Sequence, residues 1–371
     1  MYITELELKN FRNYKELTIQ FDKNVNIIVG RNAQGKTNLI EAVFLSSIGR
    51  SFRTSHDSDL IRFGQEEAFV RVRAEKEVID TKVEIKINRH HKKSIQKDGN
   101  TVHRTSQLID NIIIVIFSPD DLKIVKEEPE KRRKFIDREL AQIKPAYYDC
   151  LSNYKKTLQQ RNACLKEDYV EPSLLSLWDE QMIIYGSDII RMRKDFIDRI
   201  NEYSSRIHRG ITNRSENLSL QYDPNIRFCE TKEEQQEVYR KELMKSAASD
   251  LRMRTTTRGP QKDDLQFFVN GVNARSFGSQ GQQRTCALSL KLAELDFIRE
   301  ETGEKGILLL DDVMSELDES RRDYLVKTLH ENQLFITTTD IDPGILEYYP
   351  QARIIEIEKG ECVNLEKPAN L

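Results

Sequence analysis

The sequence predicts an α/β fold that carries a phosphate-binding loop and an inserted helical second domain. Three observations lead to this prediction. A match to the pattern G-x-x-x-x-G-K-[ST] lies between an apolar run and a segment of helical spacing. A second apolar run, Ile307–Leu310, ends in two aspartates. Between these two segments, residues 119–211 have helical periodicity and alternating charge.

Composition limits the class of protein. The 371-residue chain has a net charge of -3, which argues against a polycation that coats nucleic acid along its whole surface. No apolar run approaches the roughly 20 residues that span a bilayer. The start Met1–Glu5 lacks the basic and apolar regions of a secretion signal. The five cysteines of the chain are far apart in sequence, which favours reduced thiols. From these observations together we expect a cytoplasmic protein without membrane contact.

The first part of the chain has a mostly β pattern. Alternating residues at 17–21, a turn at 22–24 and the apolar run Val25–Val29 predict a hairpin that leads into the phosphate loop. Alternation returns at 69–73 and 83–87, and Asp98-Gly99-Asn100 is a turn signal. The continuous apolar run 112–117 predicts a buried central strand.

The character of the sequence then becomes helical. Ser118 followed by Pro119 predicts the start of a helix, with the serine as its cap. Interruptions near Pro129, Pro145 and Pro172 divide residues 119–211 into several antiparallel segments. Further strands are expected at 218–222 and 265–269, with a helix at 233–251 between them.

The phosphate loop has the setting that its chemistry requires. A strand precedes it and a helical pattern, Asn38–Ile48, follows it. Loop N–H groups and the helix N-terminus form an anion site, Lys36 directs a charge at the β/γ-phosphates, and the Thr37 hydroxyl is a ligand for Mg²⁺. We therefore expect a nucleoside triphosphate. The expected binding residues are Gly30, Arg31, Asn32, Ala33, Gln34, Gly35, Lys36 and Thr37.

The two aspartates supply the other half of this chemistry. In a parallel sheet, ligands lie beyond the carboxyl ends of the strands, so Asp311 should emerge beside the phosphate loop. There it would hold Mg²⁺ opposite Thr37. Asp312 would orient or deprotonate the attacking water, with Lys36 as the other catalytic residue.

A second anion site is predicted where a Gly/Ser-rich turn begins an amphipathic helix. Ser279, Gly281 and Gln282 lie in this turn, before apolar residues at helical spacing. A turn of this kind is by itself usually only a helix cap. Its position in the chain, between the phosphate loop and the two aspartates, supports the interpretation as an anion site.

At this point the chain resembles a known family. Ser279-Gln280-Gly281-Gln282 resembles the signature motif of ABC-type ATPases, Asp311-Asp312 their Walker B end and Ser315–Asp318 their D-loop. Together with segments 8–14 and 129–137, these motifs resemble the RecF family of recombination and repair proteins, relatives of the Rad50 and SMC heads. The likeness covers nearly the whole chain.

The resemblance implies an ABC-type P-loop ATPase head, formed by residues 1–118 and 212–371, with residues 119–211 as a helical insertion. It implies a homodimer that closes on ATP, with the loop of one copy facing Ser279 and Gly281 of the other. It also implies DNA binding through the backbone, weak DNA-stimulated ATP hydrolysis, and work with RecO and RecR in loading RecA at gaps. For backbone contact, candidate basic residues are Arg50, Arg53, Arg62, Arg71, Arg73, Lys131, Arg132, Arg133, Lys134 and Arg138.

Two positions depart from the ABC pattern. Segment 336–340 has no switch histidine, and 117–119 has no Q-loop glutamine. Without these groups the attacking water is less well oriented, so slow turnover is expected. Two alternatives stay open: a nucleotide-gated clamp that does not hydrolyse ATP, and a small-molecule phosphotransferase.

Overall fold

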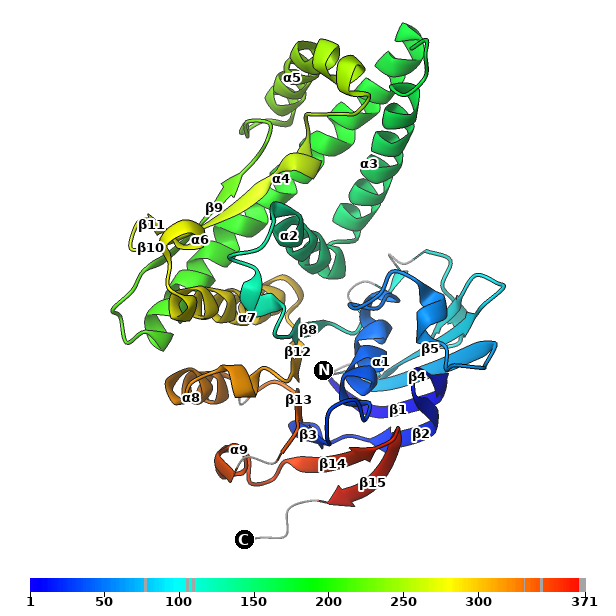
Figure 1. Ribbon diagram of the computed structural model, residues 1–371, viewed down its shortest axis with the longest axis vertical. Coiled ribbons are helices and arrows are strands. Elements are labelled where there is room, and N and C mark those ends of the chain that lie inside the picture. Colours follow the sequence, from blue (N-terminus) through cyan, green and yellow to red (C-terminus); the bar gives the residue numbers. More distant parts are fainter. Residues whose placement is uncertain (77–78, 105–106, 109–110, 330, 341–342, 367–371) are drawn as a thin grey trace. The chain divides into compact units, whose positions relative to one another are not determined.

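The structure is a computed structural model that describes residues 1–76, 79–104, 107–108, 111–329, 331–340 and 343–366 (Figure 1). The chain divides into two compact units, which are described separately. Unit 1 combines residues 1–121 with the chain from 298 onward, and unit 2 is formed by residues 122–297. Among the described residues, no helix has both the length and the apolarity needed to cross a membrane.

Unit 1 contains a six-stranded sheet whose order is β15-β14-β3-β13-β12-β8. All neighbouring pairs are parallel except β14 with the final strand β15. Every residue of β12 and β8 is buried, which explains their continuous apolar runs. The prediction that residues 112–117 form a central strand was wrong in its position, because β8 lies at the edge of the sheet. The strands are β3 (Val25–Val29), β8 (Ile114–Phe117), β12 (Ile307–Asp311), β13 (Leu334–Thr338), β14 (Arg353–Glu358) and β15 (Glu361–Glu366).

A second six-stranded sheet of unit 1 is antiparallel, in the order β2-β1-β4-β5-β6-β7. The predicted hairpin before the phosphate loop was wrong, because β2 pairs with β1 while β3 joins the other sheet. The turn at Asp98-Gly99 is confirmed, and both residues have positive φ. These strands are β1 (Tyr2–Phe11), β2 (Tyr14–Gln20), β4 (Glu67–Glu75), β5 (Thr81–Asn88), β6 (Ser94–Lys97) and β7 (Asn100–Thr101).

The core of unit 1 joins both sheets to helix α1 (Lys36–Ile48). Leu8 of β1, Phe44 of α1 and Leu309 of β12 belong to one buried apolar cluster. Most of α1 is buried, so its apolar residues are not confined to one stripe. Helices α8 (Glu319–Thr328) and α9 (Pro343–Tyr348) complete the unit.

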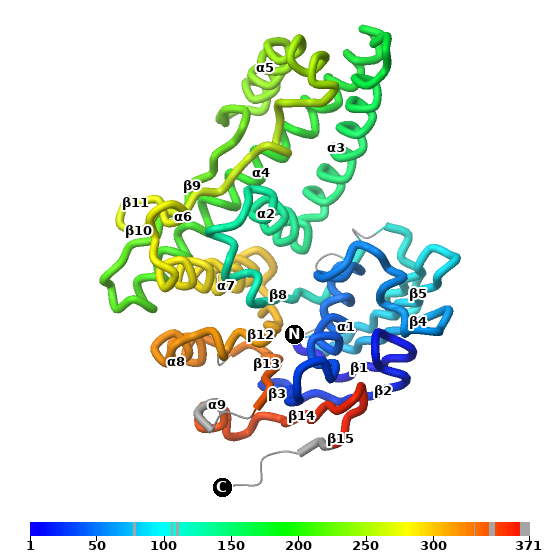
Figure 2. Tube along the Cα trace, in the orientation of Figure 1, coloured from blue at the N-terminus to red at the C-terminus, as the bar shows by residue number. Residues whose placement is uncertain are grey.

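Unit 2 is mainly helical. Proline occupies the first turn of α2 (Pro129–Ile143), α3 (Pro145–Cys164) and α4 (Pro172–Ile211), which confirms the predicted breaks. Figure 2 shows α3 running alongside α4. The predicted helix start at Ser118 was wrong. Only a 3-10 turn, Asp121–Lys123, forms there, and the Ser118 hydroxyl donates to Asp121 instead of capping a helix.

Residues 212–297 lie in unit 2, although we expected them with the ATPase head. They contain helices α5 (Lys232–Met253) and α6 (Ala274–Phe277), most of α7 (Gln280–Thr302), and a three-stranded antiparallel sheet. This sheet packs on α4, where the Asn201 side chain accepts a hydrogen bond from the Leu220 N–H at 2.6 Å. Helix α4 and this sheet therefore belong to one compact unit, while the extent of the ATPase head stays a prediction. The strands are β9 (Leu218–Asp223), β10 (Asp264–Val269) and β11 (Val272–Asn273).

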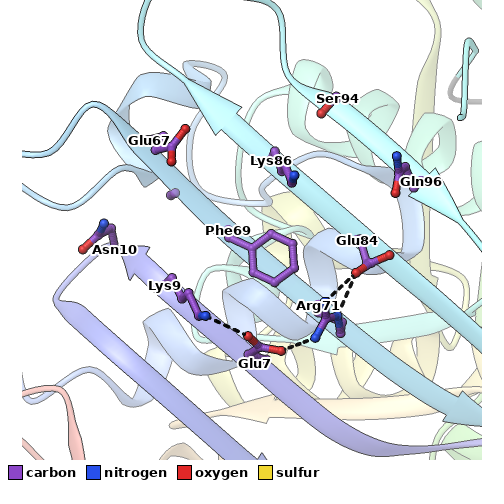
Figure 3. A pocket seen from close by; sticks show the side chains of 11 residues that line it. Glu7, Lys9, Asn10, Glu67, Phe69, Arg71, Glu84, Lys86, Ser94 and Gln96 are labelled. Atoms are coloured by element: carbon purple, nitrogen blue, oxygen red, sulfur yellow. Dashed lines mark hydrogen bonds and ion pairs between the residues drawn. The ribbon is translucent and has the colours of Figure 1, made fainter. Parts of the chain in front are cut away.

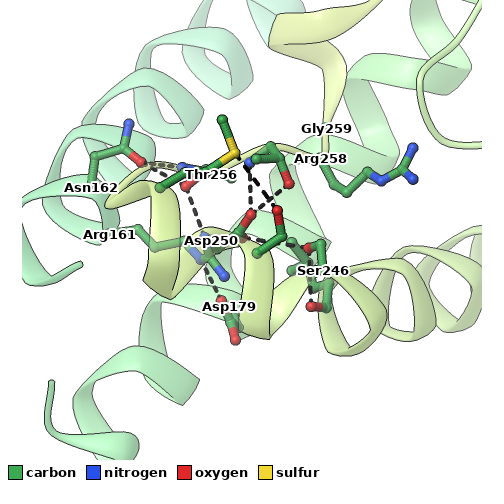
Figure 4. A network of polar contacts seen from close by, with 12 residues as sticks. Arg161, Asn162, Asp179, Ser246, Asp250, Thr256, Arg258 and Gly259 are labelled. Atoms are coloured by element: carbon green, nitrogen blue, oxygen red, sulfur yellow. Dashed lines mark hydrogen bonds and ion pairs between the residues drawn. The ribbon is translucent and has the colours of Figure 1, made fainter.

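Buried ion pairs hold the helices of unit 2 together. The Arg161 guanidinium on α3 bonds Asp179 of α4 at 2.6 Å and Asp250 of α5 at 2.8 Å (Figure 4). Arg193 of α4 similarly joins Asp137 of α2 to Asp263, each at 2.8 Å. Removal of one partner would leave a buried charge uncompensated and would destabilise the packing of these helices.

Candidate functional site

The loop from β3 to α1 is a close-packed turn that requires glycine at two points. Gly35 has φ of 123°, a conformation that side chains disfavour. A Cβ added at Gly30 would lie 2.4 Å from the carbonyl oxygen of Ile357 in β14, too close for any other residue type. The glycines of the sequence motif are therefore required by the backbone itself.

Side chains and backbone from other strands hold this loop from outside. Asn13 Nδ2 donates to the Gln34 carbonyl at 2.8 Å, and the Gly360 N–H donates to the same oxygen at 3.0 Å. The buried Tyr14 hydroxyl donates to the Gly35 carbonyl at 2.9 Å. Sequence reasoning assigned no role to these outer residues, since only the tertiary fold brings the β1–β2 and β14–β15 turns to the loop.

Lys36 is the cation of the loop. Its Nζ donates to the carbonyl oxygen of Gly30 and, at 3.1 Å, to that of Arg31. Burial lowers the pKa of Lys36, while the nearby carboxylates of Asp312 and Asp311 act in the opposite direction. The Lys36 ammonium is thus held inside the loop, while residues 31–33 of the same loop are exposed to solvent.

Thr37 meets Asp311 at the carboxyl end of the parallel sheet. The Thr37 hydroxyl donates to Asp311 Oδ1 at 3.0 Å, and the Thr337 hydroxyl of β13 donates to the same oxygen at 2.8 Å. Burial raises the pKa of Asp311, although both hydroxyl donors favour its ionised form. The structure therefore brings together the two residues that the sequence predicted to share a metal.

The backbone of Asp312, the residue after β12, is held in a defined conformation. Its φ is 55°, in the left-handed region, and its N–H donates to the Thr337 hydroxyl at 3.0 Å. The Ser315 hydroxyl bonds the Asp312 carbonyl oxygen at 3.0 Å. Thr337 thus contacts both acidic residues, a role that sequence reasoning missed because it noted this segment only for its lack of histidine.

The residues present fit a magnesium ion. A hydroxyl and a carboxylate are the oxygen ligands that Mg²⁺ prefers, and the ion usually completes its shell with phosphates and water. In the described parts of the chain, no group of three or more His, Cys, Asp or Glu side chains could hold a metal alone. Thr37 and Asp311 would therefore hold the ion together with a phosphate ligand.

The Ser279 turn lies in unit 2 and forms a reciprocal cap on α7. The Ser279 N–H donates to Gln282 Oε1 at 2.9 Å, and the Gln282 N–H donates to the Ser279 hydroxyl at 3.2 Å. Ser279 is exposed and Gly281 is half-buried. The turn therefore presents the hydroxyl of an exposed serine at the start of α7.

Comparison with known proteins agrees with these motifs. The family model of the RecF/RecN/SMC N terminal domain matches residues 2–347. The DNA replication and repair protein RecF of Clostridium tetani is 42% identical over 366 residues, covering 98% of this chain and all of that protein. This chain belongs to the RecF family.

Solved structures extend the RecF likeness to the fold. The recombination mediator protein RecF-ATPrS is 37% identical, with a TM-score of 0.91, and the match covers 99% of this chain and 98% of that one. An Smc head bound to the C-winged helix domain of ScpA is 18% identical, with a TM-score of 0.56 over 96% of this chain and 94% of that one. The predicted ABC-type head fold and the RecF resemblance are both confirmed.

Much of the positive charge considered for DNA contact is neutralised locally in this RecF-family chain. On the antiparallel sheet, Arg71 is held between Glu7 and Glu84, in a hollow that also contains Lys9 and Lys86 (Figure 3). In α2, Lys131 pairs with Glu127, Lys134 with Glu130, and the buried Arg132 with Asp264. Neither region is a simple cationic surface.

Proposed function

We propose that this chain is an ATP-dependent DNA-binding protein of recombinational repair and replication restart. The observation that carries the proposal is the contact between Thr37 and Asp311 at the mouth of the glycine loop. It joins a phosphate-binding loop to an acidic strand end, which is the pairing used in P-loop nucleotide hydrolysis. Membership of the RecF family supports the DNA-directed role.

Each residue of the loop has a part in this proposal. Backbone N–H groups of Gly30–Thr37 surround the phosphates, and Lys36 exchanges its contacts with loop carbonyls for β/γ-phosphate oxygens. Thr37 and Asp311 would hold Mg²⁺, and the bound ion would supply positive charge beside the phosphates. Asp312 orients the attacking water or accepts its proton.

The second half-site comes from another copy of the chain. Ser279, Gly281 and Gln282 present a hydroxyl and helix N-terminal groups, which attract an anion. The two motifs lie in different units, and neither alone surrounds a γ-phosphate. ATP then favours the dimer because it binds the closed state more tightly, and hydrolysis releases it.

ATP hydrolysis is slow in this scheme, and DNA stimulates it. Thr337 and Thr338 occupy the region where a switch histidine would stand, and neither is a general base at neutral pH. DNA, as duplex or duplex beside a gap, binds through its backbone, and by family likeness RecR and RecO help to load RecA there. The cytoplasm is the expected location.

Sedimentation with no nucleotide, ADP or ATP, each with Mg²⁺ and with or without duplex DNA, tests the proposal. We expect a dimer that binds DNA only with ATP. Asp312→Asn should accumulate that dimer if hydrolysis opens it, and should change nothing in a clamp that does not hydrolyse ATP. A chain that stays monomeric when saturated with ATP would refute the proposal, and phosphate transfer to a small molecule would favour the phosphotransferase.

A further inference from the structure

The side chain of Gln282 is held at both ends. Its Oε1 accepts from the Ser279 N–H at 2.9 Å, and its Nε2 donates to Glu216 Oε1 at 2.8 Å. An amide has one accepting and one donating end, so this arrangement defines its orientation. The turn that carries Ser279 is therefore connected to Glu216, a residue of the loop between α4 and β9.

Glu216 is held in turn by a buried histidine. His208 Nε2 lies 3.3 Å from Glu216 Oε2, and His208 Nδ1 lies 3.1 Å from the Ser289 hydroxyl of α7. The Ser289 hydroxyl also donates to the Thr285 carbonyl at 2.7 Å. The Glu216 carboxylate is therefore in contact with a histidine side chain that is fully buried.

The backbone on both sides of Glu216 is also constrained. The Arg214 N–H bonds the Arg209 carbonyl at 2.7 Å and closes the end of α4. Beyond Glu216, the Asn217 N–H donates to Asn270 Oδ1, and the Asn270 N–H donates to the Asn217 carbonyl, both at 2.9 Å. The carboxylate is thus presented to Gln282 from a fixed position.

We propose that Glu216, held by His208, is a positioning residue for the Ser279–Gln282 turn. It fixes the Gln282 amide, which holds the Ser279 N–H and thereby positions the Ser279 hydroxyl to donate to the triphosphate of the partner copy. The inference rests on the proposed function, because it concerns the second half-site of the same dimer. It assigns no contact with nucleotide to Glu216 itself.

Dimerisation with ATP and Mg²⁺ tests this role in full-length variants. Glu216→Ala should weaken the ATP-dependent dimer about tenfold, the effect of losing one hydrogen bond to a charged group. ATP binding by the monomer should be unchanged, because the Lys36 loop is untouched. Glu216→Gln keeps an acceptor for Gln282 and should restore most of the dimer. The matched control is Glu242→Ala, since Glu242 and Glu216 are both 22% exposed and Glu242 pairs with Lys245 on α5.

A second variant removes the other partner of the Glu216–Gln282 hydrogen bond. Gln282→Ala strands no buried charge, and it should cause the same loss, with no further loss in the double variant Glu216→Ala/Gln282→Ala. Additive losses, or dimers as stable as wild type in either single variant, would overturn the inference while leaving the proposed function intact. A wild-type chain that fails to dimerise with ATP would instead remove the proposed function, and this inference with it.

Discussion

The Thr37 hydroxyl and the Asp311 carboxylate are 3.0 Å apart, although 274 positions separate them in the chain. Asp311 is the last residue of β12, whereas Thr37 lies in the first turn of α1, after the loop that follows β3. In the sheet, β13 lies between β3 and β12. Thr337 of β13 fills this gap by donating to the Asp311 oxygen that Thr37 also contacts. The carboxyl ends of three parallel strands thus lie close to one carboxylate, that of Asp311. Thr337, near the end of the middle strand, helps to fix its orientation.

Thr337→Val should separate ATP binding from hydrolysis. Valine has a similar shape, but it leaves the Asp312 N–H without its acceptor and Asp311 without one donor. Misplacement of catalytic groups by about 1 Å can cost on the order of 100-fold in rate. We expect a single-turnover rate reduced roughly 10- to 100-fold, with ATP affinity within about threefold of wild type.

Thr337→Ser provides the control, because serine retains the hydroxyl that both contacts need. Its hydrolysis rate should lie close to that of wild type. Equal rates in the valine and serine variants would show that the hydroxyl does not organise the two acids.

Gly30→Ala should weaken nucleotide binding about tenfold or more by displacing the loop. The added methyl group would lie 2.4 Å from the Ile357 carbonyl oxygen, and that backbone atom cannot turn aside. Either the loop or β14 must shift, and backbone groups that shift no longer surround the phosphates. Titration with a fluorescent ATP analogue should show at least a tenfold loss of affinity. Gly303→Ala is the comparison. Its φ of 73° disfavours alanine, but nothing lies within 4 Å of the added carbon and no part of the phosphate loop is displaced, so normal binding is expected.

The motifs of the site could be predicted from sequence because they are local or paired by a general rule. The Gly30–Thr37 loop needs only its strand and helix, and Asp311 follows from the rule that ligands lie beyond the ends of parallel strands. The helix breaks near Pro129 and Pro145 could also be predicted, because proline is tolerated only in the first turn of a helix and so separates one helix from the next.

Features that depend on long-range pairing could not be predicted. The alternation in β2 and the apolar run of β3 are compatible with a hairpin, and only the tertiary fold sends the two strands into different sheets. The contact from Gly360 to Gln34 likewise joins turns that no spacing relates. These contacts depend on which strands become neighbours in the folded protein, and the local sequence does not encode that.

Asp137→Asn should destabilise the protein in a pH-dependent way. Burial alone would raise the pKa of Asp137, but the charges of Arg193 and Lys155 outweigh it and hold that pKa below its ordinary value. An acid of this kind adds stability above its unfolded pKa, and the contribution is lost as pH falls through the lower folded pKa. Loss of one partner of a buried pair costs about 3 kcal/mol, so urea unfolding at pH 7 should show a deficit of that order.

The pH profile distinguishes this charge effect from a packing defect. The deficit of Asp137→Asn should stay constant from pH 7 to about pH 5, then shrink below the ordinary value of 3.8 as the wild-type carboxylate gains its proton. Asp195→Asn is the control, because Asp195 is half-exposed in its pair with Lys144 and should cost less than about 1 kcal/mol. A deficit that is equal at pH 7 and pH 3 would mean that the asparagine disturbs packing, and that the Asp137–Arg193 charge pair does not stabilise α2 against α4.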